Sequence, residues 1–209
     1  MIRKNTINCK LINIKNVKFS AYDIYNNAMD DINLDDEICP SCGLKGGCSP
    51  HASYSRYLID FIGNNIEYRQ IEITRVICDC GSTHAILPDP IIPYNQYSLF
   101  FILLVLSVYF LHLMTVENLC NKYSITPKML YRWSSIYSEH RREWQGLLKS
   151  TTTDIKKSIL ELCQKDPYSS FAFFFIQKTS YSFLQTHANP ANCKQNLQFG
   201  FFPTAYHTT

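Results

Sequence analysis

The sequence predicts an α+β fold in which a small antiparallel hairpin precedes a helical half. Two runs rich in β-branched and aromatic residues, 54–62 and 66–77, have the composition of strands and are bracketed by paired cysteines. The segment 87–94 carries three prolines, so we expect an extended connector there. Beyond it, the apolar run 98–114 and the patterned stretch 115–144 are typical of helices.

These features divide the 209 residues into four parts. The N-terminal extension ends in an acidic stretch, 30–37, that we expect to be a solvated linker. The C-terminal tail is rich in aromatic residues and is expected to be partly helical and partly irregular. The predicted parts are the extension (1–37), the cysteine-bearing hairpin with its proline-rich connector (38–94), the helical region (95–150) and the tail (151–209).

The two predicted strands flank a Gly-Asn-Asn turn at 63–65, whose residues tolerate positive φ at little cost. In the second strand, Ile71, Ile73 and Ile77 occupy alternating positions, which is the spacing of a half-buried strand. We therefore expect an antiparallel hairpin with these three isoleucines on its buried face.

Two cysteine pairs at the base of this hairpin predict a metal site. Cys39 and Cys42 have the Cys-x-x-Cys spacing of a knuckle turn, followed by Gly43 where such a turn needs positive φ. Cys78 and Cys80 form a Cys-x-Cys pair, one residue shorter than the usual second knuckle. Four thiolates suit tetrahedral Zn²⁺. The sequence thus predicts a small zinc ribbon held by these four cysteines.

Other residues near the predicted site are alternative ligands. If the shortened pair cannot complete the tetrahedron, Cys48, His51 or His84 is close enough in sequence to replace one cysteine. Four cysteine ligands leave no open position for water, so we expect a structural rather than a catalytic site. The first ten residues lack the apolar segment of a secretory signal. A cytoplasmic chain keeps its thiols reduced, which favours ligand or core cysteines over disulfides.

Residues 115–140 have the pattern of a helix-turn-helix. A first helix through Leu119 and Tyr123 is expected to stop at 124–125, with Ile125 as the buried residue of the turn. Thr126 is a favourable N-cap for the second helix and Pro127 suits its first position. Leu130 and Trp133 would then lie on the inner face of that helix.

The opposite face of this second helix is a candidate DNA-binding surface. Basic, aromatic and hydroxyl side chains there could contact base edges and phosphates in a major groove. Residues 98–149 hold six basic against three acidic residues, in a chain of net charge +3. His140, Arg141 and Arg142 are expected to extend the basic surface. The predicted DNA-contacting residues are Lys128, Tyr131, Arg132 and Ser135.

The apolar run 98–114 is expected to be a buried core helix. Its 17 residues fall short of the roughly 20 that a membrane span needs, and Ser98, Ser107 and His112 interrupt it. A helix-turn-helix also needs an apolar surface on which to pack. We therefore expect no membrane partner, and a small membrane protein spanning at 98–114 is the alternative.

Several short motifs between residues 39 and 150 occur together in one protein family. These features are Cys39-Pro-Ser-Cys42, His51, Tyr54, Arg56, Arg75-Val76-Ile77-Cys78, Thr83-His84-Ala85, Leu87-Pro88, Pro93-Tyr94 and Leu130-Tyr131-Arg132-Trp133. With them, residues 39–150 resemble an uncharacterised family of bacterial transposase-like proteins that pair a zinc ribbon with a helix-turn-helix. Members usually carry Cys-x-x-Cys at the second knuckle, where this chain has Cys-x-Cys. The resemblance implies DNA binding linked to mobile elements, by a transposase-like or accessory protein.

The sequence therefore predicts a DNA-binding protein of transposase-like or mobile-element accessory type, with Zn²⁺ as its cofactor. Its expected partners are double-stranded DNA and a recombinase or other mobile-element protein. We do not expect an enzyme, because the 60 residues after 149 are too few for a nuclease core and hold only three acidic side chains. The main alternative is a protein-interaction module that docks through the aromatic tail.

Overall fold

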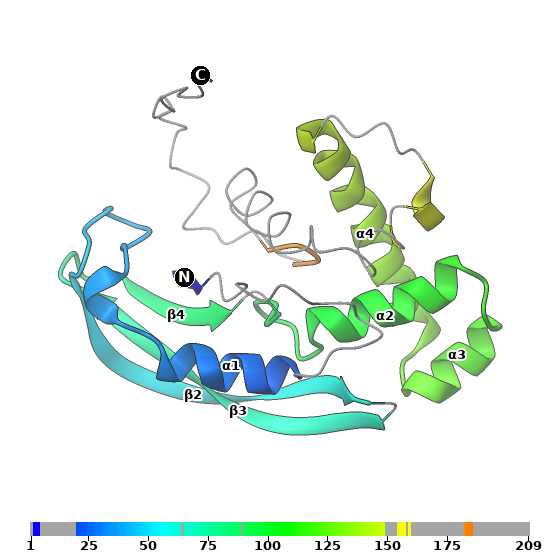
Figure 1. Ribbon diagram of the computed structural model, residues 1–209, viewed down its shortest axis with the longest axis horizontal. Coiled ribbons are helices and arrows are strands. Elements are labelled where there is room, and N and C mark those ends of the chain that lie inside the picture. The colour runs from blue at the N-terminus through cyan, green and yellow to red at the C-terminus, as the bar shows by residue number, and fades with distance from the viewer. Residues whose placement is uncertain are drawn as a thin grey trace, which may run out of the picture.

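The central element of the fold is a long antiparallel hairpin formed by β2 (Cys48–Ile62) and β3 (Asn65–Cys78). The computed structural model describes residues 2–4, 20–63, 65–88, 90–148, 154–157, 159 and 182–185 (Figure 1). The register runs from Cys48 opposite Cys78 to Ile62 opposite Asn65. Gly63, with φ of 60°, lies in the tight turn between them. The predicted hairpin is confirmed, and both strands are longer than the sequence indicated.

Two further strands extend the hairpin into a mixed sheet. β4 (Thr83–Pro88) pairs with β3 in antiparallel fashion, and β1 (Ile2–Lys4) pairs with β4 in parallel, giving the order β1-β4-β3-β2. The sequence pattern did not predict β4, which takes up the start of the expected connector. After β4 the chain turns at 90–94, where Ile91 and Ile92 are fully buried.

The N-terminal part of the chain contributes a helix that the sequence analysis missed. α1 (Ala21–Asp30) begins at a capping box, in which the Ser20 hydroxyl accepts from the Asp23 N–H and the Asp23 carboxylate accepts from the Ser20 N–H. A short 3-10 turn, η2 (Leu34–Asp36), follows. Ile32 and Leu34 pack on a buried cluster, so the stretch 30–37 is not only the solvated linker that was expected.

Three helices form the second half of the described chain: α2 (Leu99–Phe110), α3 (Val116–Tyr123) and α4 (Pro127–Leu148). α2 is the predicted core helix, and nine of its 12 residues are buried. It ends earlier than the apolar run does, because His112 adopts a left-handed conformation with φ of 55°. None of the helices in the described part of the chain is long and apolar enough to cross a membrane.

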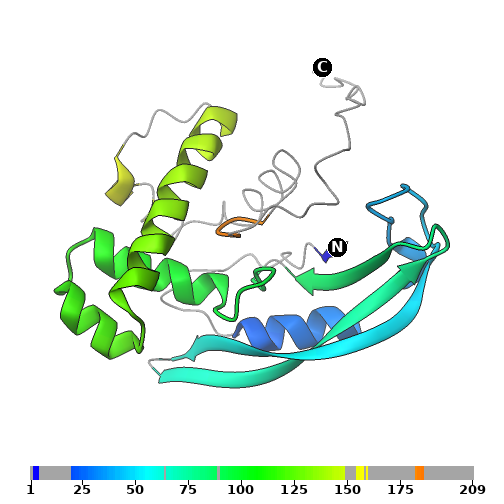
Figure 2. The same cartoon turned by 180° about the vertical axis from the view of Figure 1, so that it is seen from behind.

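The main core joins the turn end of the hairpin to these helices (Figures 1 and 2). The Phe61 ring of β2 stacks on Phe101 of α2, with centroids 4.6 Å apart and planes 7° from parallel. Tyr123 of α3 meets both rings edge-on. Tyr97 contacts Trp133 of α4 at 5.0 Å between centroids. Strands and helices thus share one apolar cluster. The four-part division of the chain made from the sequence stays a prediction.

The two ends of β3 bury opposite faces. Ile71 and Ile73 belong to the main core, whereas Val76 and Cys78 belong to a second, smaller cluster. Because side chains alternate along a strand, odd and even positions face opposite sides of the sheet. Ile77 lies on the same face as Ile71 and Ile73, as predicted, but it is only partly buried, because the opposite face is the more buried one at that end of β3.

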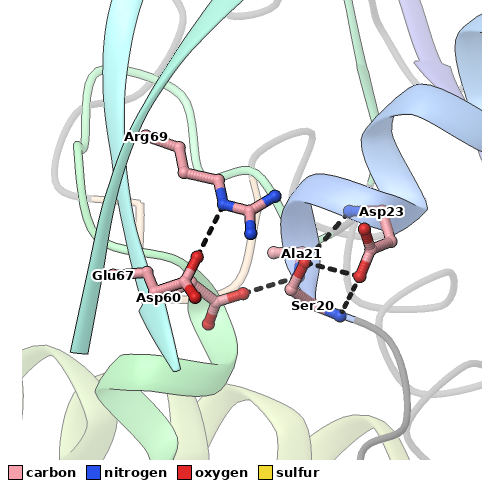
Figure 3. Close-up of polar contacts among 6 residues, drawn as sticks. All are labelled: Ser20, Ala21, Asp23, Asp60, Glu67 and Arg69. Atoms are coloured by element: carbon pink, nitrogen blue, oxygen red, sulfur yellow. Dashed lines mark hydrogen bonds and ion pairs between the residues drawn. The ribbon is translucent and has the colours of Figure 1, made fainter. Parts of the chain in front are cut away.

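A buried carboxylate links the hairpin to the starts of two helices. Asp60 of β2 is 5% exposed, and its Oδ2 atom accepts a hydrogen bond from the Ala21 N–H at 2.5 Å (Figure 3). Its Oδ1 atom accepts from the Ser98 hydroxyl at 2.6 Å, and Ser98 is the N-cap of α2. Burial raises the pKa of Asp60, although the hydrogen bond from Ser98 opposes this. A negative charge beside two helix N-termini is favourable.

Replacing Asp60 with Ala is expected to lower the free energy of unfolding by about 2–4 kcal/mol, since it leaves two donors without their partner. Urea denaturation followed by circular dichroism measures this change. The control is Glu67→Ala, which breaks the partly exposed Glu67–Arg69 ion pair and should cost no more than about 1 kcal/mol. Equal losses in the two variants would contradict the role assigned to Asp60.

Candidate functional site

The first cysteine pair lies in a tight turn just before β2. The Gly43 N–H donates to the Cys39 carbonyl at 2.8 Å, and the Cys39 N–H donates to the Leu44 carbonyl at 2.9 Å. Gly43 has φ of 78°, the left-handed conformation expected from its place after Cys42. These bonds orient both sulfur atoms of the pair toward the end of β3.

The second pair lies in a similar turn between β3 and β4. The Cys78 N–H donates to the Ser82 carbonyl at 2.9 Å, and the Gly81 N–H donates to the Cys78 carbonyl at 2.8 Å. Gly81 has φ of 81°. A further hydrogen bond joins the two turns, from the Asp79 N–H to the Gly47 carbonyl at 2.9 Å. This bond and the pairing of β2 with β3 place the two cysteine pairs next to each other.

The four predicted cysteine ligands come together in space. The sulfur atoms of Cys39, Cys42, Cys78 and Cys80, here called the cysteine quartet, all lie within 4.8 Å of one another. The Sγ–Sγ distances are 3.8 Å for Cys39 to Cys80 and 3.7 Å for Cys42 to Cys78. A tetrahedron with metal–sulfur bonds of about 2.3 Å has edges of about 3.8 Å. The quartet therefore fits a metal ion, and the shortened Cys-x-Cys pair completes it.

The thiols of the quartet have different pKa values because they lie so close together. Hydrogen bonds from the side chain and backbone of Ser82 lower the pKa of Cys80 to about 6. A hydrogen bond at Leu44 favours the thiolate of Cys42, but desolvation and the neighbouring thiols outweigh it and raise the pKa of Cys42 to about 12. Negative charges at such short range repel one another. A bound divalent cation removes that repulsion and allows all four thiols to ionise.

The three alternative ligands take other positions. Cys48 is 6% exposed and lies opposite Cys78 in the sheet, but it is not one of the quartet. His51 is exposed at an irregularity in β2. His84 of β4 is buried, with Nε2 3.3 Å from the Cys39 sulfur. A ring N–H there can donate to a thiolate, so His84 adjoins the site as an outer contact. Its place in β4 depends on strand pairing that the sequence pattern did not reveal.

A second candidate region is the connection between α3 and α4. Ser124 ends α3 in a left-handed conformation with φ of 51°, and Ile125 is 7% exposed. The Met129 N–H donates to the Thr126 hydroxyl at 3.2 Å, so Thr126 is the N-cap that its place before Pro127 predicted. The predicted end of the first helix and start of the second are confirmed.

The two faces of α4 differ as the sequence pattern indicated. Leu130 and Trp133 are buried on one side at 0% and 4% exposure. Here the name α4 outer face is used for Lys128, Tyr131, Arg132 and Ser135, which are all exposed. His140 does not extend the basic surface as expected, because it is buried and its Nδ1 atom accepts from the Leu184 N–H at 3.0 Å. That the outer face contacts DNA stays a prediction.

The fold and these two regions define an α+β protein with a four-cysteine candidate metal site at one end of its hairpin and a pair of closely joined helices at the other end. Residues 39–133 match a family described as a domain of unknown function (DUF6431). The matched segment begins at the first cysteine of the quartet and ends at Trp133 on α4. No curated protein and no solved structure matches the chain. The family match covers the cysteine quartet and the connection between α3 and α4, ends before Ser135 of the α4 outer face, and indicates no activity.

The quartet predicts that Cys80→Ser weakens metal binding far more than Cys48→Ser does. Cys80 supplies a direct ligand, so its loss should exceed the 10–100-fold effect of an outer contact and lower affinity by more than about 100-fold. Cys48→Ser changes a buried thiol at the same end of the sheet and should alter affinity by less than about tenfold. Competition with a chromophoric chelator measures both constants. Equal losses, or no metal bound by the wild-type chain, would rule out this ligand set.

Proposed function

We propose that this chain is a DNA-binding protein of transposase-like or mobile-element accessory type, in which a zinc ribbon is joined to a helix-turn-helix. The observation that carries the proposal is the α4 outer face. Lys128, Tyr131, Arg132 and Ser135 are exposed together on a capped helix whose opposite side is buried in the core. A helix whose inner face packs on the core and whose outer face is exposed to solvent is suited to insertion into a major groove.

The positions along α4 support contact through its N-terminal part. Lys128 is in the first turn and Arg132 follows four residues later, so the two cations lie on one face. An arginine can bond guanine with two N–H groups, and a lysine can neutralise a phosphate as a point charge. The N-terminus of the helix adds a partial positive charge at the same end. These groups together favour a negatively charged duplex as the partner.

Zinc is the metal that we propose for the quartet. Four thiolates at tetrahedral spacing are the ligand set of closed structural zinc sites, which have no open position for substrate or water. The three antiparallel strands that follow the first turn, β2, β3 and β4, supply the scaffold of a ribbon. The metal would hold the two turns together and supply no step of a reaction. That the chain has no self-contained catalytic domain stays a prediction.

The mobile-element context rests on the resemblance of residues 39–150 to transposase-like proteins. In that setting the partners would be duplex DNA and a recombinase or other mobile-element protein. A protein-interaction module is the second candidate, and one observation favours it. Tyr57 of β2 and Tyr68 of β3 are each 60% exposed and are diagonal neighbours on one face of the hairpin. Exposed aromatic side chains of this kind are frequent at protein interfaces.

The test of the DNA-binding proposal is duplex binding by variants of the α4 outer face over a salt series. Arg132→Ala is expected to cost about 1–3 kcal/mol and to relax sequence preference, if the guanidinium bonds a base. Lys128→Ala should weaken binding to all sequences and lower the salt slope by about one, since it removes one phosphate contact. Fluorescence anisotropy with a labelled duplex gives both quantities.

Lys45→Ala is the matched control for these variants. It also removes one positive charge, but at the cysteine end of the hairpin, where the exposed Lys45 pairs with Asp36 at 3.1 Å. The affinity of this variant for the duplex should therefore change little. Unchanged affinity for the duplex in both Lys128→Ala and Arg132→Ala, with intact circular dichroism spectra, would show that α4 does not contact DNA. The protein-interaction module would then be the favoured function.

A further inference from the structure

A hollow of about 480 Å³ lies between the cysteine turns and the turn at 90–94. Side chains from β2, β3 and β4 form its walls, and it is open to solvent on one side. The described residues that line it include one arginine, three hydroxyl residues and two tyrosines, but no aspartate or glutamate. Its volume lies within the range of sites for small organic ligands. Its polar lining, in the part of the chain that the structure describes, is therefore suited to an anion.

Arg75 is the cation in this hollow. It is partly buried on β3, and one of its terminal nitrogens donates to the Thr83 hydroxyl at 2.6 Å. Within the described residues no carboxylate pairs with Arg75. Two other arginines of the hairpin are engaged differently: Arg69 bonds Glu67 at 2.6 Å, and Arg56 donates to backbone carbonyls. Arg75 thus keeps guanidinium N–H groups for a ligand in the hollow.

Two tyrosines at the hollow present aromatic surface. Tyr94 is 73% exposed and Tyr54 is 43% exposed. Tyr94 adopts φ of 59°, an uncommon conformation for a residue with a large side chain. Arg56 holds the turn by donating to the Ile92 carbonyl at 3.2 Å and to the Asn95 carbonyl at 2.5 Å. The turn is therefore fixed on both sides of Tyr94, with its ring exposed.

We propose that this hollow binds a nucleotide, with its phosphate on Arg75 and its base against the ring of Tyr94 or Tyr54. Arginine is suited to phosphate because its N–H groups can form two parallel bonds to the oxygens. A tyrosine ring can stack on any base, since every base has a planar face. The nucleotide is either a free mononucleotide or one unit of a single strand. This inference does not rest on the α4 outer face, which would contact a duplex.

Isothermal titration of the full-length, metal-loaded chain tests the proposal. The probes are adenosine monophosphate, adenosine, inorganic phosphate and an oligothymidylate single strand. Wild-type protein is expected to bind the mononucleotide or the strand, and to bind adenosine at least about tenfold more weakly because the charged hydrogen bonds are missing. Binding of the mononucleotide identifies a free ligand, whereas binding of the strand alone identifies a nucleic acid.

Three variants then locate the site. Arg75→Gln should weaken binding by at least about tenfold with metal content unchanged. Tyr94→Leu should weaken base-containing probes but leave inorganic phosphate unaffected. Arg142→Gln, which removes one positive charge at an exposed position of α4, should leave the affinity for the mononucleotide unchanged. No binding of any probe, or equal affinity in Arg75→Gln and wild type, overturns the proposal. Arg132→Ala separates the two proposals, since it should weaken duplex binding and relax its sequence preference while the affinity for the mononucleotide stays unchanged.

Discussion

The antiparallel pairing of β2 with β3 is the constraint on which both candidate regions depend. At one end it sets Cys48 opposite Cys78, which brings the two cysteine turns together. At the other end it presents Phe61 to Phe101 of α2, and the helices that carry the α4 outer face pack around that contact. A slip of one residue would turn every side chain of one strand to the other face of the sheet. The cysteine quartet and the aromatic core would then be lost together.

The two ends of this hairpin are stabilised by different interactions. The turn end is covered by α2, α3 and α4 and belongs to the large apolar cluster. The cysteine end has only a small cluster, of which three of the five buried members are cysteines. So little apolar burial cannot offset the cost of ordering two turns. A metal ion bound by the quartet would supply the missing free energy there, as metals do in small metal-binding ribbons.

Local signals in the sequence predicted much of this structure. Signals between neighbours along the chain predicted three features: the cysteine quartet from the spacing of its pairs, the positive φ of Gly43 after Cys42, and the start of α4 at Thr126-Pro127. The capping box at Ser20 was available to the same reasoning but was missed. Asp60 could not be assigned from pattern, because its two partners are 39 and 38 residues away. The hollow at Arg75 likewise exists only once β3, β4 and the turn at 90–94 are assembled.

The most direct test of the proposed structural zinc site is amide hydrogen exchange of the full-length chain, measured by mass spectrometry before and after removal of metal with a chelator. The account predicts that residues 38–48 and 76–84 lose protection when the metal is removed, because the backbone of both turns then opens. Residues 99–108 of α2 should keep theirs, since they lie in the main core. Unchanged exchange in both turns after treatment with chelator would contradict the account, as would equal loss of protection in α2.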